Sequence, residues 1–153
     1  MRKLKFALLF LLASNFLIGM KLKAQKINIS TEVKTTTYQL LTEGAKAFYS
    51  KGTSFSEFKK RLVGDVVVSK EMEMLIKDIY NTLSTSKKLS NIKAPKSFDL
   101  VLNKIQNEGT GKLILNDNIK FDSNGNIQAK KINWGKWIRF AIKVLTAILE
   151  IFF

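Results

Sequence analysis

The segment from residue 134 to residue 153 constrains the fold most, because 14 of its 20 residues are hydrophobic and its charged residues are regularly spaced. The polar positions after Gly135 step by three or four residues: Lys136, Arg139, Lys143, Thr146 and Glu150. On a helix this spacing collects them into one narrow stripe and leaves a broad apolar face. We therefore predict a hydrophobic, amphipathic C-terminal helix over residues 134–153.

Three roles are open for this helix. In the first it lies in a membrane interface, where Trp side chains sit at the headgroup level and Lys or Arg side chains extend to water. In the second it spans a membrane, alone or in an oligomer, although each charge placed centrally costs roughly 2.5–3.5 kcal/mol. In the third it is the buried central helix of the domain or packs on a protein partner or a second copy. The residues predicted to contact a membrane or partner are Trp134, Lys136, Trp137, Arg139, Phe140, Lys143, Ile148, Ile151, Phe152 and Phe153.

The N-terminus has the three-part pattern of a secretory signal peptide. Residues 1–5 are basic, residues 6–20 are largely apolar, and a short polar stretch follows. The apolar run is shorter than the roughly 20 residues that a membrane-spanning helix needs. We predict a signal peptide over residues 1–24 and export to the periplasm, the outer envelope or the medium. An uncleaved N-terminal anchor is the alternative.

The composition excludes several kinds of site. The chain has no Cys and no His, so disulfides, thiolate or imidazole metal sites, and Cys or Ser-His-Asp catalysis are all impossible. The Ser-x-x-Lys pattern occurs three times in a Lys-rich chain and carries no information. The stretch beginning at Asp122 lacks the glycine and the acid that a calcium loop requires. We predict no enzymatic activity, no catalytic residues, no cofactor and no bound metal.

The net charge indicates an anionic partner. The chain holds 26 basic and 12 acidic residues, for a net charge of +14, of which +9 remains without residues 1–24. The predicted basic patch comprises Lys59, Lys60, Arg61, Lys130 and Lys131. Export disfavours nucleic acid as the partner, so an anionic lipid membrane is the better match to this charge. The alternative is that these side chains simply form a solvated face.

The region between the two hydrophobic ends predicts a small helical domain, residues 25–133. Helices are expected over 31–51, 55–62 and 70–83, and again after Pro95 up to Gly109. Ser54 and Ser69 precede helices as N-caps. From residue 112 to 129 the apolar period changes to two, and an Asn-Gly pair at 124–125 separates alternating runs, which predicts a short β-meander. The expected fold class is α+β and mainly helical.

Two functions follow as hypotheses. The first is an exported small basic protein that associates with or inserts into membranes through its C-terminal helix, with an antibacterial or membrane-active toxin as one form of that activity. The second is a periplasmic or envelope binding or structural module, in which the same helix is the core of the domain or a docking surface for a partner.

Overall fold

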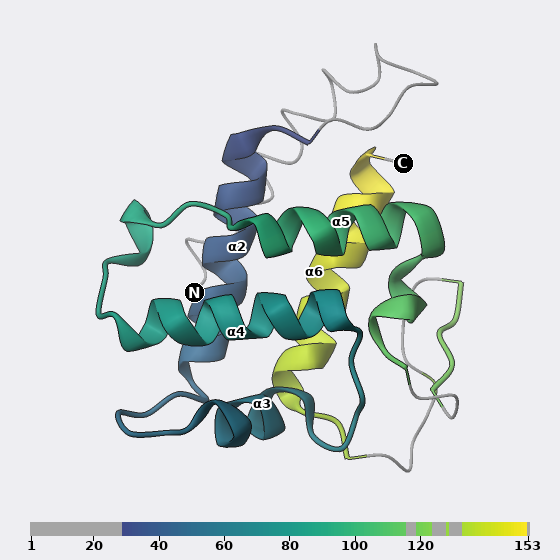
Figure 1. Ribbon diagram of the computed structural model, residues 1–153. Coiled ribbons are helices and arrows are strands. Elements are labelled where there is room, and N and C mark those ends of the chain that lie inside the picture. The colour runs from purple at the N-terminus through teal and green to yellow at the C-terminus, as the bar shows by residue number, and fades with distance from the viewer. Residues whose placement is uncertain (1–28, 116–118, 124–127, 129–132, 153) are drawn as a thin grey trace.

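The computed structural model describes residues 29–115, 119–123, 128 and 133–152 (Figure 1). The predicted signal peptide therefore lies outside the described residues. The helices are α2 (Thr31–Lys46), α3 (Phe55–Val63), α4 (Lys70–Ser84), η2 (Leu89–Asn91), α5 (Lys96–Glu108), η3 (Thr110–Leu113) and α6 (Lys136–Phe152), where η denotes a 3-10 helix. The protein is thus mainly helical over this part of the chain.

Serine side chains begin the first three α-helices. The hydroxyl groups of Ser30, Ser54 and Ser69 each accept a hydrogen bond from the backbone N–H three residues later, at 3.2–3.3 Å. These bonds satisfy backbone donors that have no partner inside the helix. The N-caps predicted at Ser54 and Ser69 are therefore confirmed. Helix α2 ends at Lys46, five residues before the predicted end.

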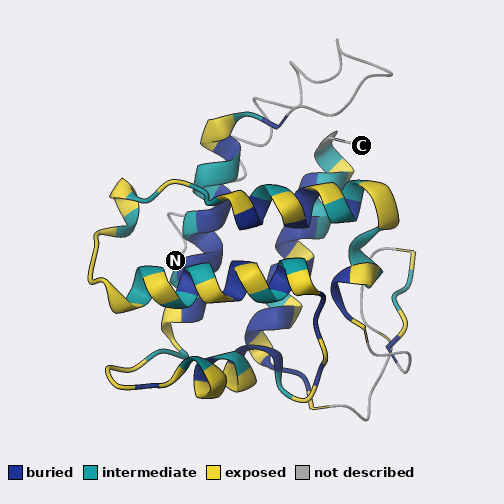
Figure 2. Cartoon of the chain, viewed as in Figure 1, coloured by how far each residue is buried: buried dark blue, intermediate teal, exposed yellow. Residues whose placement is uncertain are grey.

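The helices form two layers (Figure 1). Helices α2 and α6 run side by side in opposite directions and make the back layer in this view. Helices α4 and α5 form an antiparallel pair that crosses in front of them, and α3 lies across the end of the molecule where α6 begins. Figure 2 shows that the buried faces of the helices point towards the space between the layers. The core therefore lies between α2–α6 and α4–α5.

The predicted β-meander is wrong. The described residues contain isolated bridges, Gly64 with Trp134 and Val68 with Ile114, but no strand and no sheet. The chain after α5 instead forms η3, which packs against α5 and buries Leu113, whereas Leu115 is exposed. The residues predicted to form the turns at 116–118 and 124–125 lie outside the described residues.

The first part of this stretch, up to Leu115, forms backbone hydrogen bonds with a distant segment. The N–H of Leu115 donates to the carbonyl of Val67 at 2.7 Å, and the N–H of Ser69 donates to the carbonyl of Leu113 at 2.8 Å. These bonds join the turn before α4 to the end of η3. A local hairpin signal carries no information about such a long-range partner. Further along, the N–H of Gln128 donates to the carbonyl of Lys120 at 2.8 Å, but no strand forms among the described residues. The fold class is accordingly helical, without the predicted sheet.

Two glycines permit the backbone of α3 to touch the start of α6. A Cβ atom added to Gly135 would lie 2.0 Å from the carbonyl oxygen of Leu62, and one added to Gly64 would lie 2.1 Å from the carbonyl oxygen of Asn133. The Asp65 N–H donates to the same Asn133 oxygen at 2.9 Å. Backbone therefore meets backbone at this crossing, where no flexible side chain can move aside.

We predict that Gly135→Ala lowers the free energy of unfolding by about 3 kcal/mol or more, because the new methyl group overlaps a backbone that is fixed on both sides. Urea denaturation followed by circular dichroism measures this change. The matched control is Gly52→Ala, where nothing lies within 4 Å of the added Cβ and only the left-handed φ of 89° is unfavourable. That control should lose only about 1–2 kcal/mol. Equal losses in the two variants would contradict the close crossing.

A partly buried hydroxyl pair joins the two layers. The Tyr38 hydroxyl of α2 lies 2.9 Å from the Thr82 Oγ1 atom of α4. Burial raises the pKa of the Tyr38 phenol above its ordinary value, because the phenolate would be poorly solvated there, although the hydrogen bond to Thr82 opposes the shift. Folding thus favours the protonated form of Tyr38.

This shift predicts a stability loss at alkaline pH. Because the folded pKa of Tyr38 is raised, its contribution is fully present below the unfolded value of about 10 and is lost as the pH rises through the folded value. Compared with Tyr38→Phe, which cannot ionise, the native protein should lose stability more steeply above that pH. Urea denaturation at a series of alkaline pH values measures both slopes. Parallel slopes would show that the phenol is not protected.

Candidate functional site

The predicted contact residues lie on α6 or, for Trp134, just before it, and the structure separates them by burial. Trp134 and Trp137 are buried, with 5% and 1% of their surface exposed, and Ile148 is buried with them. Phe140 and Ile151 are half-buried at the edge of the core. The exposed set consists of Lys136, Arg139 and Lys143. The side chains of Phe152 and Phe153 are not among those described.

Helix α6 packs closely on α2. The indole N–H of Trp137 donates to the backbone carbonyl of Leu41 at 2.9 Å, in a fully buried contact. The ring of Phe140 lies over Gly44, where an added Cβ would come within 2.8 Å of it. The large aromatic side chains of α6 are thus accommodated by a missing side chain and an available carbonyl on α2. In this arrangement both Trp rings face the protein interior.

Two buried polar atoms near and on α6 are not satisfied. Neither the indole Nε1 of Trp134 nor the hydroxyl of Thr146 has a hydrogen-bond partner within the part of the chain that the structure describes. An unpaired buried donor or acceptor costs about 1–3 kcal/mol. The packing of α6 therefore carries a local penalty that its apolar contacts must offset.

The exposed cations of α6 occupy an unusual place on a helix. Helices α2, α3, α4 and α5 each have an acidic residue in the first turn, where the positive end of the helix dipole favours it. Helix α6 has none there and begins with Lys136 instead. Among the described residues, no ion pair or hydrogen bond engages the side chains of Lys136, Arg139 or Lys143. Stabilisation of the helix therefore does not explain why Lys136, Arg139 and Lys143 are cationic. We call these three residues the α6 stripe.

The predicted basic patch is assembled only in part. Lys59 forms an ion pair with Glu73 at 3.2 Å, and the Arg61 guanidinium donates to the carbonyl of Phe48 at 3.4 Å. Lys60 is exposed and has no partner of either kind in the described chain. Because α3 crosses the start of α6, Lys60 and Arg61 belong to the helix that packs near the Lys136 end of the α6 stripe. Lys130 and Lys131 lie outside the described residues.

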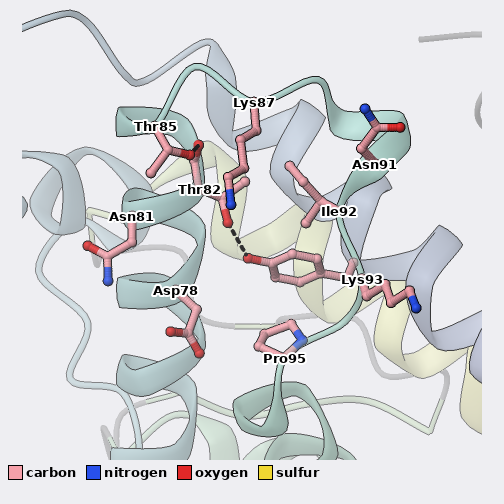
Figure 3. Close-up of a pocket in the computed structure, with 10 residues that line it drawn as sticks. Asp78, Asn81, Thr82, Thr85, Lys87, Asn91, Ile92, Lys93 and Pro95 are labelled. Carbon is pink, nitrogen blue, oxygen red and sulfur yellow. Dashed lines mark hydrogen bonds between the residues drawn. The ribbon is translucent and has the colours of Figure 1, made fainter.

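The structure also contains a cleft that the sequence interpretation missed. It lies between the C-terminal half of α4 and the connection over residues 85–95, with Tyr38 of α2 in its wall (Figure 3). In the sequence, residues 85–95 appear only as a Ser/Thr/Lys-rich connection. The other residues that line the cleft lie on α2 and α4. No local pattern indicates that they meet.

Neither a metal centre nor a relative assigns a role to these features. No group of three or more acidic side chains in the described residues is placed to hold a metal ion. None of the described helices has the combined length and apolarity needed to cross a bilayer. Comparison with protein-family models, with characterised proteins and with solved structures finds no match.

The two tryptophans give a matched prediction about the packing of α6. Trp137→Phe removes a satisfied buried hydrogen bond and part of a ring, so we expect a loss of about 2–3 kcal/mol in the free energy of unfolding. Trp134→Phe removes a donor that has no partner, so its loss should stay below about 1 kcal/mol. Urea denaturation followed by circular dichroism measures the free energy of unfolding of both variants. A larger loss at Trp134 would contradict the contacts described here.

Proposed function

We propose that this chain is an exported envelope module that docks on an anionic lipid surface through the α6 stripe, while the apolar face of the same helix forms the core of its domain. The observation that carries the proposal is the division of α6 into a buried apolar face and three exposed cations without partners. The proposal combines the predicted membrane association with the predicted role of the helix as core.

The energetics support a peripheral, salt-sensitive association. A Lys or Arg near an anionic membrane surface contributes about 1 kcal/mol, and the attraction falls off within a Debye length. The α6 stripe together with Lys60 supplies four exposed cations. Their side chains are free to reach headgroup phosphates because no acid in the described chain competes for them.

A second candidate is insertion of α6 after it leaves the core, as a membrane-active toxin would require. The observation that favours it is the location of the unsatisfied buried atoms, the indole of Trp134 and the hydroxyl of Thr146. At a bilayer interface a Trp N–H can bond to headgroups or water while its ring remains in an apolar layer. Release of α6 would therefore remove the free-energy cost of these unsatisfied buried atoms. It would also expose the core that α6 fills.

Vesicle flotation tests the docking proposal. The protein, purified from cells that export it, is mixed with vesicles of phosphatidylglycerol or of phosphatidylcholine at low and high salt. We expect flotation with the anionic vesicles at low salt only. Replacing the α6 stripe with Gln (K136Q/R139Q/K143Q) should weaken the association about 100-fold, from about 1 kcal/mol for each cation.

The control variant removes the same net charge elsewhere. Lys70, Lys88 and Lys96 are exposed and have no ion pair in the described chain, so K70Q/K88Q/K96Q matches the change in charge. This control should keep most of the association. Equal weakening in the two triple variants would show that only net charge matters, and flotation with neutral vesicles would contradict an electrostatic dock.

Tryptophan fluorescence separates docking from insertion, because Trp134 and Trp137 are the only tryptophans in the chain and both are on this segment. With brominated lipids, peripheral docking should leave their emission unquenched, since both rings are buried in the protein. Strong quenching together with vesicle leakage would favour the insertion candidate instead.

A further inference from the structure

The cleft at the end of α4 combines charged and apolar walls. Its volume is about 430 Å³, within the range of small-molecule sites. Figure 3 shows Asp78 and Thr82 on α4, Lys87 descending from the 85–95 connection, and Pro95 at the base. Ile92 and the ring of Tyr38 add apolar surface. No residue of α6 lines it, so the cleft is separate from the α6 stripe.

Three charged side chains line this cleft: Asp78, Lys87 and Lys93. Lys93 extends away from the other two in Figure 3, whereas Asp78 and Lys87 face the cleft and do not pair with each other. Asp78 is held in place because its Oδ2 atom accepts a hydrogen bond from the buried hydroxyl of Ser97 on α5. Its other oxygen has no partner in the described chain, and neither Asp78 nor Lys87 takes part in an ion pair there. Figure 3 shows the Asp78 carboxylate turned towards Pro95, at the opposite end from the Lys87 ammonium. The cleft thus presents a fixed anion at one end and a cation at the other.

The Lys87 end also offers a hydroxyl proton. The side chain of Lys87 reaches towards the pair formed by the Tyr38 hydroxyl and Thr82 Oγ1, which lie 2.9 Å apart. When Tyr38 donates to Thr82, the Thr82 hydroxyl keeps its own hydrogen to donate to a ligand. The Thr42 side chain is also a hydrogen-bond neighbour of the Tyr38 hydroxyl. The Tyr38 phenol is protonated at neutral pH even at its ordinary pKa of 10.0, and burial raises that pKa further. An ammonium and a hydroxyl donor together are suited to a carboxylate.

We infer that this cleft binds a short peptide in its zwitterionic form, with the terminal carboxylate between Lys87 and the Tyr38–Thr82 hydroxyl pair and the terminal ammonium at Asp78. The apolar walls at Ile92 and Pro95 are placed to contact the peptide between its two ends. A single amino acid holds its two charged groups on one carbon, whereas a di- or tripeptide separates them. This binding activity is additional to membrane docking and depends on different residues.

The experiment titrates the isotopically labelled, purified full protein with the dipeptide Ala-Ala and follows the backbone amide resonances. We expect saturable shifts in the C-terminal half of α4 and in residues 85–95. Two blocked probes test the ends separately: N-acetyl-Ala-Ala lacks the ammonium, and Ala-Ala-amide lacks the carboxylate. Each should bind at least about 5-fold more weakly than Ala-Ala, as the loss of one charge-assisted hydrogen bond predicts.

Two conservative variants assign each end of the peptide. Asp78→Asn keeps an oxygen that accepts from Ser97, so it should fold and should lose the preference for Ala-Ala over the acetylated probe. Lys87→Gln should lose the preference for Ala-Ala over the amide, and each variant should keep the preference that belongs to the other end. Lys88→Gln, at an exposed neighbour outside the cleft lining, should keep both preferences.

Certain results of these titrations would overturn the inference. Ala-Ala that produces no saturable shift in these segments, or that binds no better than both blocked probes, excludes a zwitterion site. The same is true if Lys88→Gln changes the preferences as much as Lys87→Gln does. Vesicle binding by the same protein is measured independently, so either proposal can fail without the other.

Discussion

The burial of α6 against α2 and α3 is the constraint on which the rest of this structure depends. Its apolar face fills the space that the other helices surround, and apolar burial stabilises a fold by roughly 25 cal/mol for each Å² removed from water. The Trp137 indole adds a directional contact by donating to a carbonyl in the middle of α2. Without α6, the buried faces of α2 and α3 would have no covering partner on this side.

Close approach of the backbones makes this packing possible. Gly44 leaves room for the ring of Phe140, while Gly64 and Gly135 let the end of α3 and the start of α6 touch through their main chains. Each of these contacts is possible only because glycine has no side chain at that position. The position of α6 is therefore set at two points, one on each neighbouring helix, and its exposed cations are oriented as a consequence.

Local signals in the sequence predicted the helices well and the long-range contacts poorly. The caps at Ser54 and Ser69 are correct because a cap depends on residues only three positions apart. The β-meander is wrong because the partner of the stretch around Ile114 is Val68, more than forty residues earlier. Alternating apolar residues do not encode such a partner, and a 3-10 turn against α5 buries Leu113 equally well.

At the candidate site, too, local sequence patterns predicted the local features and missed the contacts between distant segments. The spacing of polar residues on α6 identified the exposed cations, since helical periodicity is a local property. It did not reveal whether the apolar face meets protein or lipid, because both environments favour the same residues. Likewise, Tyr38, Asp78 and Lys87 come from separate segments, and only the tertiary fold brings them to one cleft.

The arrangement of charges bears on the choice between the two proposed roles of α6, docking on a membrane surface and insertion into it. All the ion pairs among the described residues join or lie on α2, α3, α4 and α5, and none involves α6. Some of the acids of those helices are therefore already paired, whereas the cations of the α6 stripe have no ion pair among the described residues. If α6 entered a bilayer, its apolar face would leave the core and its cations would have to remain at the surface. Docking through the stripe, as we propose it, requires neither change. The packing of α6 in the core is therefore the reason for proposing surface association ahead of insertion.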